Sequence, residues 1–160
     1  MHINEKLLIG WKEWCALSKL NIPAIKTKID TGAKTSSLHA ENIKLIQHHG
    51  NSYVSFQIYP LQNNTSIVIN CESKIIDERM IMSSNGQKEH RYIIQTPITL
   101  GNKTWDIELS LSNRDPLKFR MLLGREALKG MAIIDPERML CQGRILQRKL
   151  REMYKVIHSS

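Results

Sequence analysis

The sequence lacks several patterns by which common classes of protein are recognised. Its three cysteines, Cys15, Cys71 and Cys141, are odd in number and too far apart for a disulfide framework or for the paired CxxC spacing of a zinc site. It contains no HExxH metal motif and no GxxxxGK[ST] nucleotide loop. No stretch approaches the roughly 20 apolar residues that span a bilayer, and residues 1–10 contain no secretory apolar core. These absences predict a cytoplasmic protein with no membrane span, metal or other cofactor.

What the sequence does have is sufficient length and an uneven positive charge. At 160 residues and 18.5 kDa, the chain can form one domain with a hydrophobic core of its own. The net charge is +8, and residues 116–160 hold ten Lys and Arg against four Asp and Glu. A basic block of this kind favours polyanionic partners such as nucleic acid, the ribosome or an acidic peptide.

Short runs of β-forming residues alternate with turn residues along most of the chain. In residues 24–29, Ile25, Thr27 and Ile29 alternate with two lysines, which predicts a half-buried strand that delivers Asp30 to a turn. Further runs of this type cover residues 52–60, 66–69, 74–82, 91–100 and 105–111. Many short strands at this spacing predict a mostly β sandwich or barrel.

Two stretches favour helix. Residues 125–129 are strong helix formers followed by Gly130, a common residue after a helix end. Residues 144–157 predict a basic amphipathic helix, which either packs on its own domain or a dimer mate, or docks on RNA, the ribosome or a membrane surface. Its apolar stripe consists of Ile145, Leu146, Leu150, Met153, Tyr154 and Ile157. We therefore divide the chain into a domain of residues 1–142 and a basic helical tail of residues 143–160.

The most informative segment is residues 28–40, KIDTGAKTSSLHA. Its Asp-Thr-Gly-Ala turn after an apolar strand resembles the active-site turn of aspartic proteases. Residues 121–128, MLLGREAL, resemble the apolar-apolar-Gly-Arg element that retropepsins place beside that turn. Together with residues 9–14, IGWKEW, these segments resemble a bacterial retropepsin-like family that carries the label of ATP-dependent zinc proteases and is associated with RimK-type glutamate ligases. The resemblance covers roughly residues 6–142.

This resemblance implies a retropepsin-like acid-protease barrel and an aspartic endopeptidase whose catalytic acid is Asp30. Thr31 would bond across a dimer axis, and Gly32 would let a substrate backbone approach. Ala33 and Lys34 would contact the substrate.

Gly124, which precedes the short helix, and Arg125 would support the catalytic turn. In viral enzymes the position of Lys34 is an aspartate, and the arginine that corresponds to Arg125 interacts with that aspartate. The partner of Arg125 is therefore left open between Glu41, Asp135 and backbone carbonyls.

Peptide hydrolysis by aspartates requires two carboxylates that share a proton, one as base toward water and one as acid toward the amide. Because the chain has one such turn, a homodimer with a twofold axis would supply the second Asp30. The 94 positions from Asp30 to Gly124 exceed the length of a minimal viral enzyme. They predict an enlarged flap or an inserted hairpin, with residues 53–70 as the candidate flap.

Other chemistry-bearing residues have plainer interpretations. His48 and His49 are adjacent and are expected to point apart, away from any shared metal, and His39 is interpreted as a hydrogen-bonded structural residue. Trp11, Trp14 and Trp105 are interpreted as core or interface residues.

Two functions follow from these features. The first is an aspartic peptidase acting on peptide or isopeptide bonds in acidic or glutamate-modified protein tails, with a ribosomal or glutamate-ligase partner. The alternative is a non-catalytic, protease-like module that docks a polyanion through its basic C-terminal region.

Overall fold

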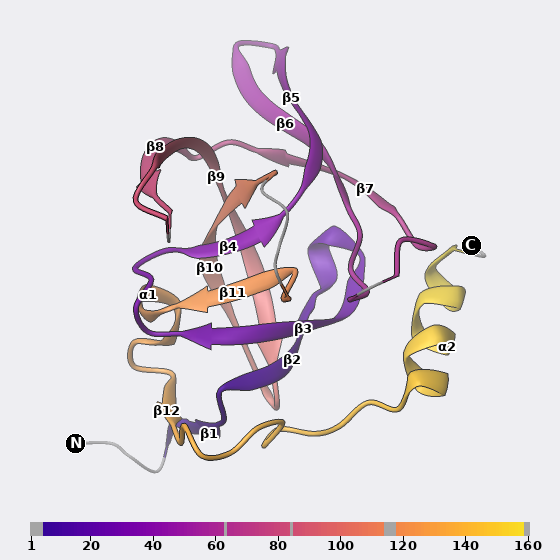
Figure 1. Cartoon of the computed structure of the whole chain (residues 1–160). Helices are drawn as coiled ribbons and strands as arrows, with labels where there is room; N and C mark the ends of the chain where they lie inside the picture. Colours follow the sequence, from indigo (N-terminus) through magenta and orange to yellow (C-terminus); the bar gives the residue numbers. More distant parts are fainter. Residues whose placement is uncertain (1–4, 63, 84, 114–117, 159–160) are drawn as a thin grey trace.

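The computed structural model describes residues 5–62, 64–83, 85–113 and 118–158, and its architecture is mostly β (Figure 1). The largest sheet contains β2 (Lys12–Leu17), β3 (Ile22–Asp30), β4 (Ser36–His39), β8 (Asp77–Met82), β9 (Lys88–Leu100), β10 (Lys103–Ser112) and β11 (Met121–Gly124). A three-stranded sheet contains β5 (Glu41–His48), β6 (Asn51–Ile58) and β7 (Ile69–Lys74), and β1 (Leu7–Ile9) pairs with β12 (Ala132–Ile134). The helical elements are the 3-10 turn η2 (Ser18–Leu20), α1 (Arg125–Leu128) and α2 (Gln147–His158).

The large sheet curls back on itself. Its strand order is β10-β4-β11-β3-β2-β9-β8, and β9 also pairs with β10, so that strands distant in this order meet. The curl does not make a regular closed barrel, because β2 and β9 share a single bridged pair, Ala16 and Thr99. The mostly β, retropepsin-like fold expected from the sequence is thus confirmed, although β2 and β9 are joined by little pairing.

Strand β3 has the alternation that its sequence predicts. Ile25, Thr27 and Ile29 are buried, whereas Lys26 is half-buried and Lys28 is exposed. Since successive side chains of a strand point to opposite faces, one face of β3 joins the core and the other carries lysines.

The extra length before Gly124 forms an inserted sheet. Strands β5, β6 and β7 make it, and Figure 1 shows the β5–β6 hairpin projecting above the rest of the molecule. Within the candidate flap of residues 53–70, Val54, Phe56 and Ile58 belong to the hydrophobic core. One face of β6 is therefore packed in the core; of the two expectations for the extra length, the structure shows the inserted hairpin, and the flap at residues 53–70 stays a prediction.

Helix α2 packs on its own domain, which is the first of the alternatives that its sequence left open. Leu150 and Tyr154 are buried, and the Tyr154 hydroxyl donates a hydrogen bond to the carbonyl of Ala24 in β3. Leu146 was expected in the apolar stripe but is 77% exposed, because it precedes the first residue of the helix. The side chain of Ile157 lies outside the described part of the chain. Among the residues described, no helix is long and apolar enough to cross a membrane.

The tryptophans have the packing roles expected of them. Trp14 and Trp105 pack against the core cluster, and the indole Nε1 of Trp105 donates to the carbonyl of Ala127 at 3.0 Å. Trp11 meets Phe119 edge to face, with ring centroids 6.2 Å apart.

Candidate functional site

Asp30 lies at the end of β3, where the chain must cross over a neighbouring strand. Strand β11 runs parallel to β3, with Gly124 beside Asp30, and it separates β3 from β4. The turn of residues 31–35, which joins β3 to β4, therefore passes across the end of β11 (Figure 1). A Cβ atom added to Gly124 would lie 2.8 Å from the carbonyl oxygen of Ala33, so this crossing requires glycine.

The turn presents the Asp30 carboxyl group near the surface. Asp30 is half-buried, and Thr31 and Gly32 are exposed. The Asp30 Oδ1 atom accepts a hydrogen bond from the Gly32 N–H at 3.1 Å, and the Ala33 N–H donates to the Asp30 carbonyl at 3.2 Å. The carboxyl group is thus oriented by its own turn rather than enclosed within the subunit.

Arg125 supports the turn through backbone carbonyls. Its Nη1 atom donates to the carbonyl oxygens of Thr31 and Gly32 at 3.1 and 3.3 Å. Its own N–H donates to the carbonyl of Ala33 at 2.8 Å. Of the partners left open by the sequence, the structure shows the carbonyls and not an ion pair with Glu41 or Asp135.

Lys34 contributes its backbone as well as an exposed side chain. Its carbonyl accepts a hydrogen bond at 3.2 Å from the N–H of Glu126 in α1. The start of α1 therefore binds the turn at consecutive carbonyls, which places the sequence-predicted residues 30–34 and 124–125 in one cluster.

Ser36 is a member of this cluster that the sequence did not single out. It is 1% exposed, and its Oγ atom accepts a hydrogen bond from the Gly124 N–H at 2.9 Å. Its carbonyl accepts from the Ser110 hydroxyl at 3.0 Å, and that hydroxyl lies 3.3 Å from Nη1 of Arg91 in β9. The β8–β9 hairpin is thereby linked to the start of β4. Serine is common in turns, so the sequence alone does not reveal that Ser36 binds the Gly124 N–H.

The N-terminal motif IGWKEW has a structural role. Glu13 is fully buried, and its carboxylate accepts hydrogen bonds from the N–H groups of Gly10, Cys141 and Gln142 at 2.7, 2.8 and 3.0 Å. A Cβ on Gly10 would clash with the backbone of Arg138. These two residues hold the segment after β12 against the start of β2.

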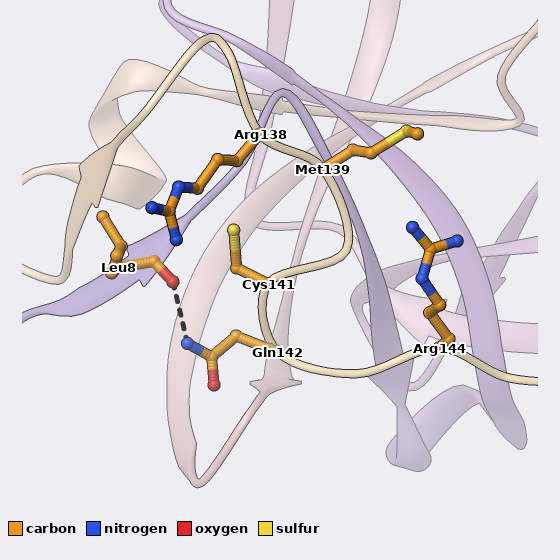
Figure 2. A pocket seen from close by; sticks show the side chains of 6 residues that line it. All are labelled: Leu8, Arg138, Met139, Cys141, Gln142 and Arg144. Atoms are coloured by element: carbon orange, nitrogen blue, oxygen red, sulfur yellow. Dashed lines mark hydrogen bonds between the residues drawn. The ribbon is translucent and has the colours of Figure 1, made fainter.

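An open hollow of about 520 Å³ lies beside that segment (Figure 2). It is lined by Leu8, Arg138, Met139, Cys141, Gln142 and Arg144, and the Gln142 side chain donates to the carbonyl of Leu8 at 2.8 Å. Burial and the nearby Glu13 carboxylate raise the pKa of the Cys141 thiol, which disfavours the nucleophilic thiolate. Burial also raises the pKa of Cys15 to about 12 and of Cys71 to about 11. None of the three is thus prepared to act as a nucleophile at neutral pH.

The histidines differ from expectation at one point. The side chains of His48 and His49 do not point away from each other, because the centroids of their imidazole rings are 4.2 Å apart. His49 follows the last residue of β5 and has a φ of 49°, in the left-handed region. This turn of the backbone brings the two rings together. His39 is buried at the end of β4. Within the described ranges, no group of three or more His, Cys, Asp or Glu side chains could hold a metal.

The arrangement of an Asp-Thr-Gly turn over a Gly-Arg strand end, on a curled β sheet, is that of an aspartic-protease-like fold. Residues 8–144 match the family described as RimB-like, retropepsin-like aspartic endopeptidase RimB. The chain belongs to this family.

Three comparisons with individual proteins add detail. A probable alpha-L-glutamate ligase of Shewanella pealeana is 45% identical over 96% of this chain, and one of Desulfotalea psychrophila is 48% identical over 93%. The chain spans about a third of the length of these curated relatives. A crystal structure of a Legionella pneumophila protein with unknown function superposes with a TM-score of 0.72 and 28% identity, covering 85% of this chain and 98% of that one.

Proposed function

We propose that this protein is an aspartic endopeptidase whose catalytic site forms between the Asp30 residues of two subunits. The observation that carries the proposal is the geometry of the turn. Asp30 is half-buried near the surface, and Arg125 and Gly124 fix the backbone around it. Family membership supports the same activity.

In this scheme each subunit contributes one carboxyl group, and the pair holds one proton. The ionised Asp30 takes a proton from a water molecule as that water attacks the amide carbon. The neutral Asp30 donates a hydrogen bond to the developing oxyanion, and a proton passes to the leaving nitrogen as the C–N bond breaks. The hydrogen bond from the Gly32 N–H to Asp30 Oδ1 would orient the carboxyl group in each subunit.

For the substrate we propose peptide or isopeptide bonds in acidic or glutamate-modified protein tails, met in the cytoplasm. The relatives that contain this module within a longer chain are named probable alpha-L-glutamate ligases, and joining glutamate to an acceptor would make that acceptor more acidic. The net charge of +8 favours encounter with such a product. A ribosomal or glutamate-ligase partner is consistent with both observations.

The test compares wild type with Asp30→Asn on polyglutamylated and unmodified peptides. The Asp30→Asn protein lacks the paired acid, so its cleavage rate should be lower by about a thousandfold or more. The control is Asp106→Asn, which changes an exposed aspartate on β10 and should leave the cleavage rate as in wild type. Mass spectrometry of the products reports both rate and bond position. Equal cleavage by the Asp30→Asn and wild-type proteins would end the proposal.

A second candidate is a non-catalytic module that docks a polyanion. The tail helix favours it, because α2 is anchored by Leu150 and Tyr154 while its basic side chains face solvent. Binding of this kind would be strongly salt-dependent and would survive Asp30→Asn. It would fail when Arg148, Lys149, Arg151 and Lys155 are replaced together by glutamine.

A further inference from the structure

The outer face of strands β2 and β3 carries three lysines in adjacent register positions. Lys12 of β2 is paired with Lys28 of β3, and Trp14 of β2 is paired with Lys26. Like charges directly opposite each other on neighbouring strands repel and destabilise a sheet. This arrangement therefore needs a compensating interaction.

Within the part of the chain that the structure describes, aromatic rings contact two of these lysines, but no carboxylate neutralises them. The Lys12 ammonium lies 4.9 Å from the ring centroid of Trp11, and the Lys26 ammonium lies 5.2 Å from that of Trp14. These cation–π contacts position the charges without neutralising them. Across the described residues, none of the three lysines forms an ion pair with a carboxylate. Burial and the neighbouring Lys12 lower the pKa of Lys26, as expected for crowded cations.

The lysines also lie in line with the catalytic turn. Along β3, Lys26, Lys28 and Asp30 alternate with buried residues and so share one face of the strand. Residues two apart in a strand are roughly 7 Å apart, about the distance between alternate side chains of an extended substrate. An acidic side chain held by Lys28 and Lys12 would thus lie within one or two residues of a bond that reaches Asp30.

We propose that Lys12, Lys26 and Lys28 form a subsite for the acidic side chains of a glutamate-rich polypeptide next to Asp30. The inference rests on the proposed function, since it names the groups that would select that substrate. Carboxylates fit the charge of the cluster, and the flanking Trp11 and Trp14 fit the methylene groups of glutamate side chains. RNA would also be attracted to the charge, but an extended polypeptide matches the spacing along β3.

The test measures binding separately from cleavage. Fluorescence anisotropy of labelled hexaglutamate is recorded with the Asp30→Asn protein, so that hydrolysis cannot consume the probe. Replacing Lys12, Lys26 and Lys28 together by glutamine should weaken binding about tenfold or more. The control replaces Lys19, Lys44 and Lys74, three exposed lysines elsewhere, by glutamine and makes the same change in net charge. Its affinity should stay within about twofold of the parent.

Several results would overturn the proposal. One is equal loss of affinity in the control variant; another is a uridine oligonucleotide of the same charge binding as tightly as hexaglutamate. A third is unchanged affinity for hexaglutamate in the Lys12, Lys26 and Lys28 variant. Retained hexaglutamate binding without cleavage by wild type would instead count against the peptidase proposal alone.

Discussion

At the scale of single residues, the Asp30 turn depends on groups that bind backbone atoms. Arg125 donates to two carbonyls of the turn, and Ser36 accepts the N–H of Gly124. Each of these contacts occupies a polar backbone group that the strand crossing leaves without a ladder partner. The position of the carboxylate is therefore controlled by residues that do not take part in chemistry themselves.

Ser36 allows a sharp test of this control. In Ser36→Ala the Gly124 N–H loses its acceptor in a buried site, and we expect the free energy of unfolding to fall by about 1–3 kcal/mol. Urea unfolding followed by circular dichroism measures the change. Ser37→Ala, at the adjacent half-buried position, is the matched control and should change stability by less than about 0.5 kcal/mol. Equal effects of the two substitutions would show that the Ser36 hydroxyl is not specifically required.

At the scale of elements, strand β11 and helix α2 hold opposite ends of β3. Strand β11 pairs beside Ile29 and Asp30, whereas α2 binds the carbonyl of Ala24 through Tyr154. Burial raises the pKa of Tyr154 well above its usual value, so its hydroxyl stays protonated and donates across the whole neutral range. The tail helix is thus part of the support of the strand that bears Asp30.

Truncating Tyr154 should reveal how much α2 contributes. We expect Tyr154→Ala to lower the free energy of unfolding by about 3–5 kcal/mol, because it empties a fully buried aromatic position. Tyr154→Phe, which removes only the hydrogen bond to Ala24, should cost about 1 kcal/mol. Arg151→Ala on the exposed face of the same helix is the control. Thermal unfolding would contradict this account if Tyr154→Ala and Arg151→Ala melted at the same temperature.

At the scale of the whole molecule, the proposed peptidase needs two copies of the chain. Each subunit has one Asp30 turn. Thr31 and Gly32 are exposed, so a second copy of the chain can approach that turn. A symmetric dimer would therefore place the same residues on both sides of the scissile bond.

Mixed dimers test this requirement directly. When wild type and Asp30→Asn are mixed at constant total protein, mixed dimers contain one carboxylate and should be inactive. Activity should then fall as the square of the wild-type fraction, to about a quarter in an equal mixture. Initial cleavage rates after subunit exchange measure the curve. A linear fall, to about half, would show that each chain works alone.

The amino-acid sequence was enough to predict the mostly β class, the alternation of β3, the helix after Gly124 and the turn that bears Asp30. Each of these features follows from a local pattern: apolar residues at every second position, a run of helix formers, or a short and distinctive motif. Residues 53–70 could not be placed this way, since a strand in an inserted sheet and a strand in a flap have the same local pattern.

The side chains that meet across long separations in the sequence became known only from the folded chain. The carbonyl partners of Arg125, the Ser36 contact with Gly124, the burial of Glu13 and the row of lysines on β2 and β3 depend on strand order and register. These are fixed by the packing of the whole core, because a shift of one residue in any strand would turn its side chains to the other face.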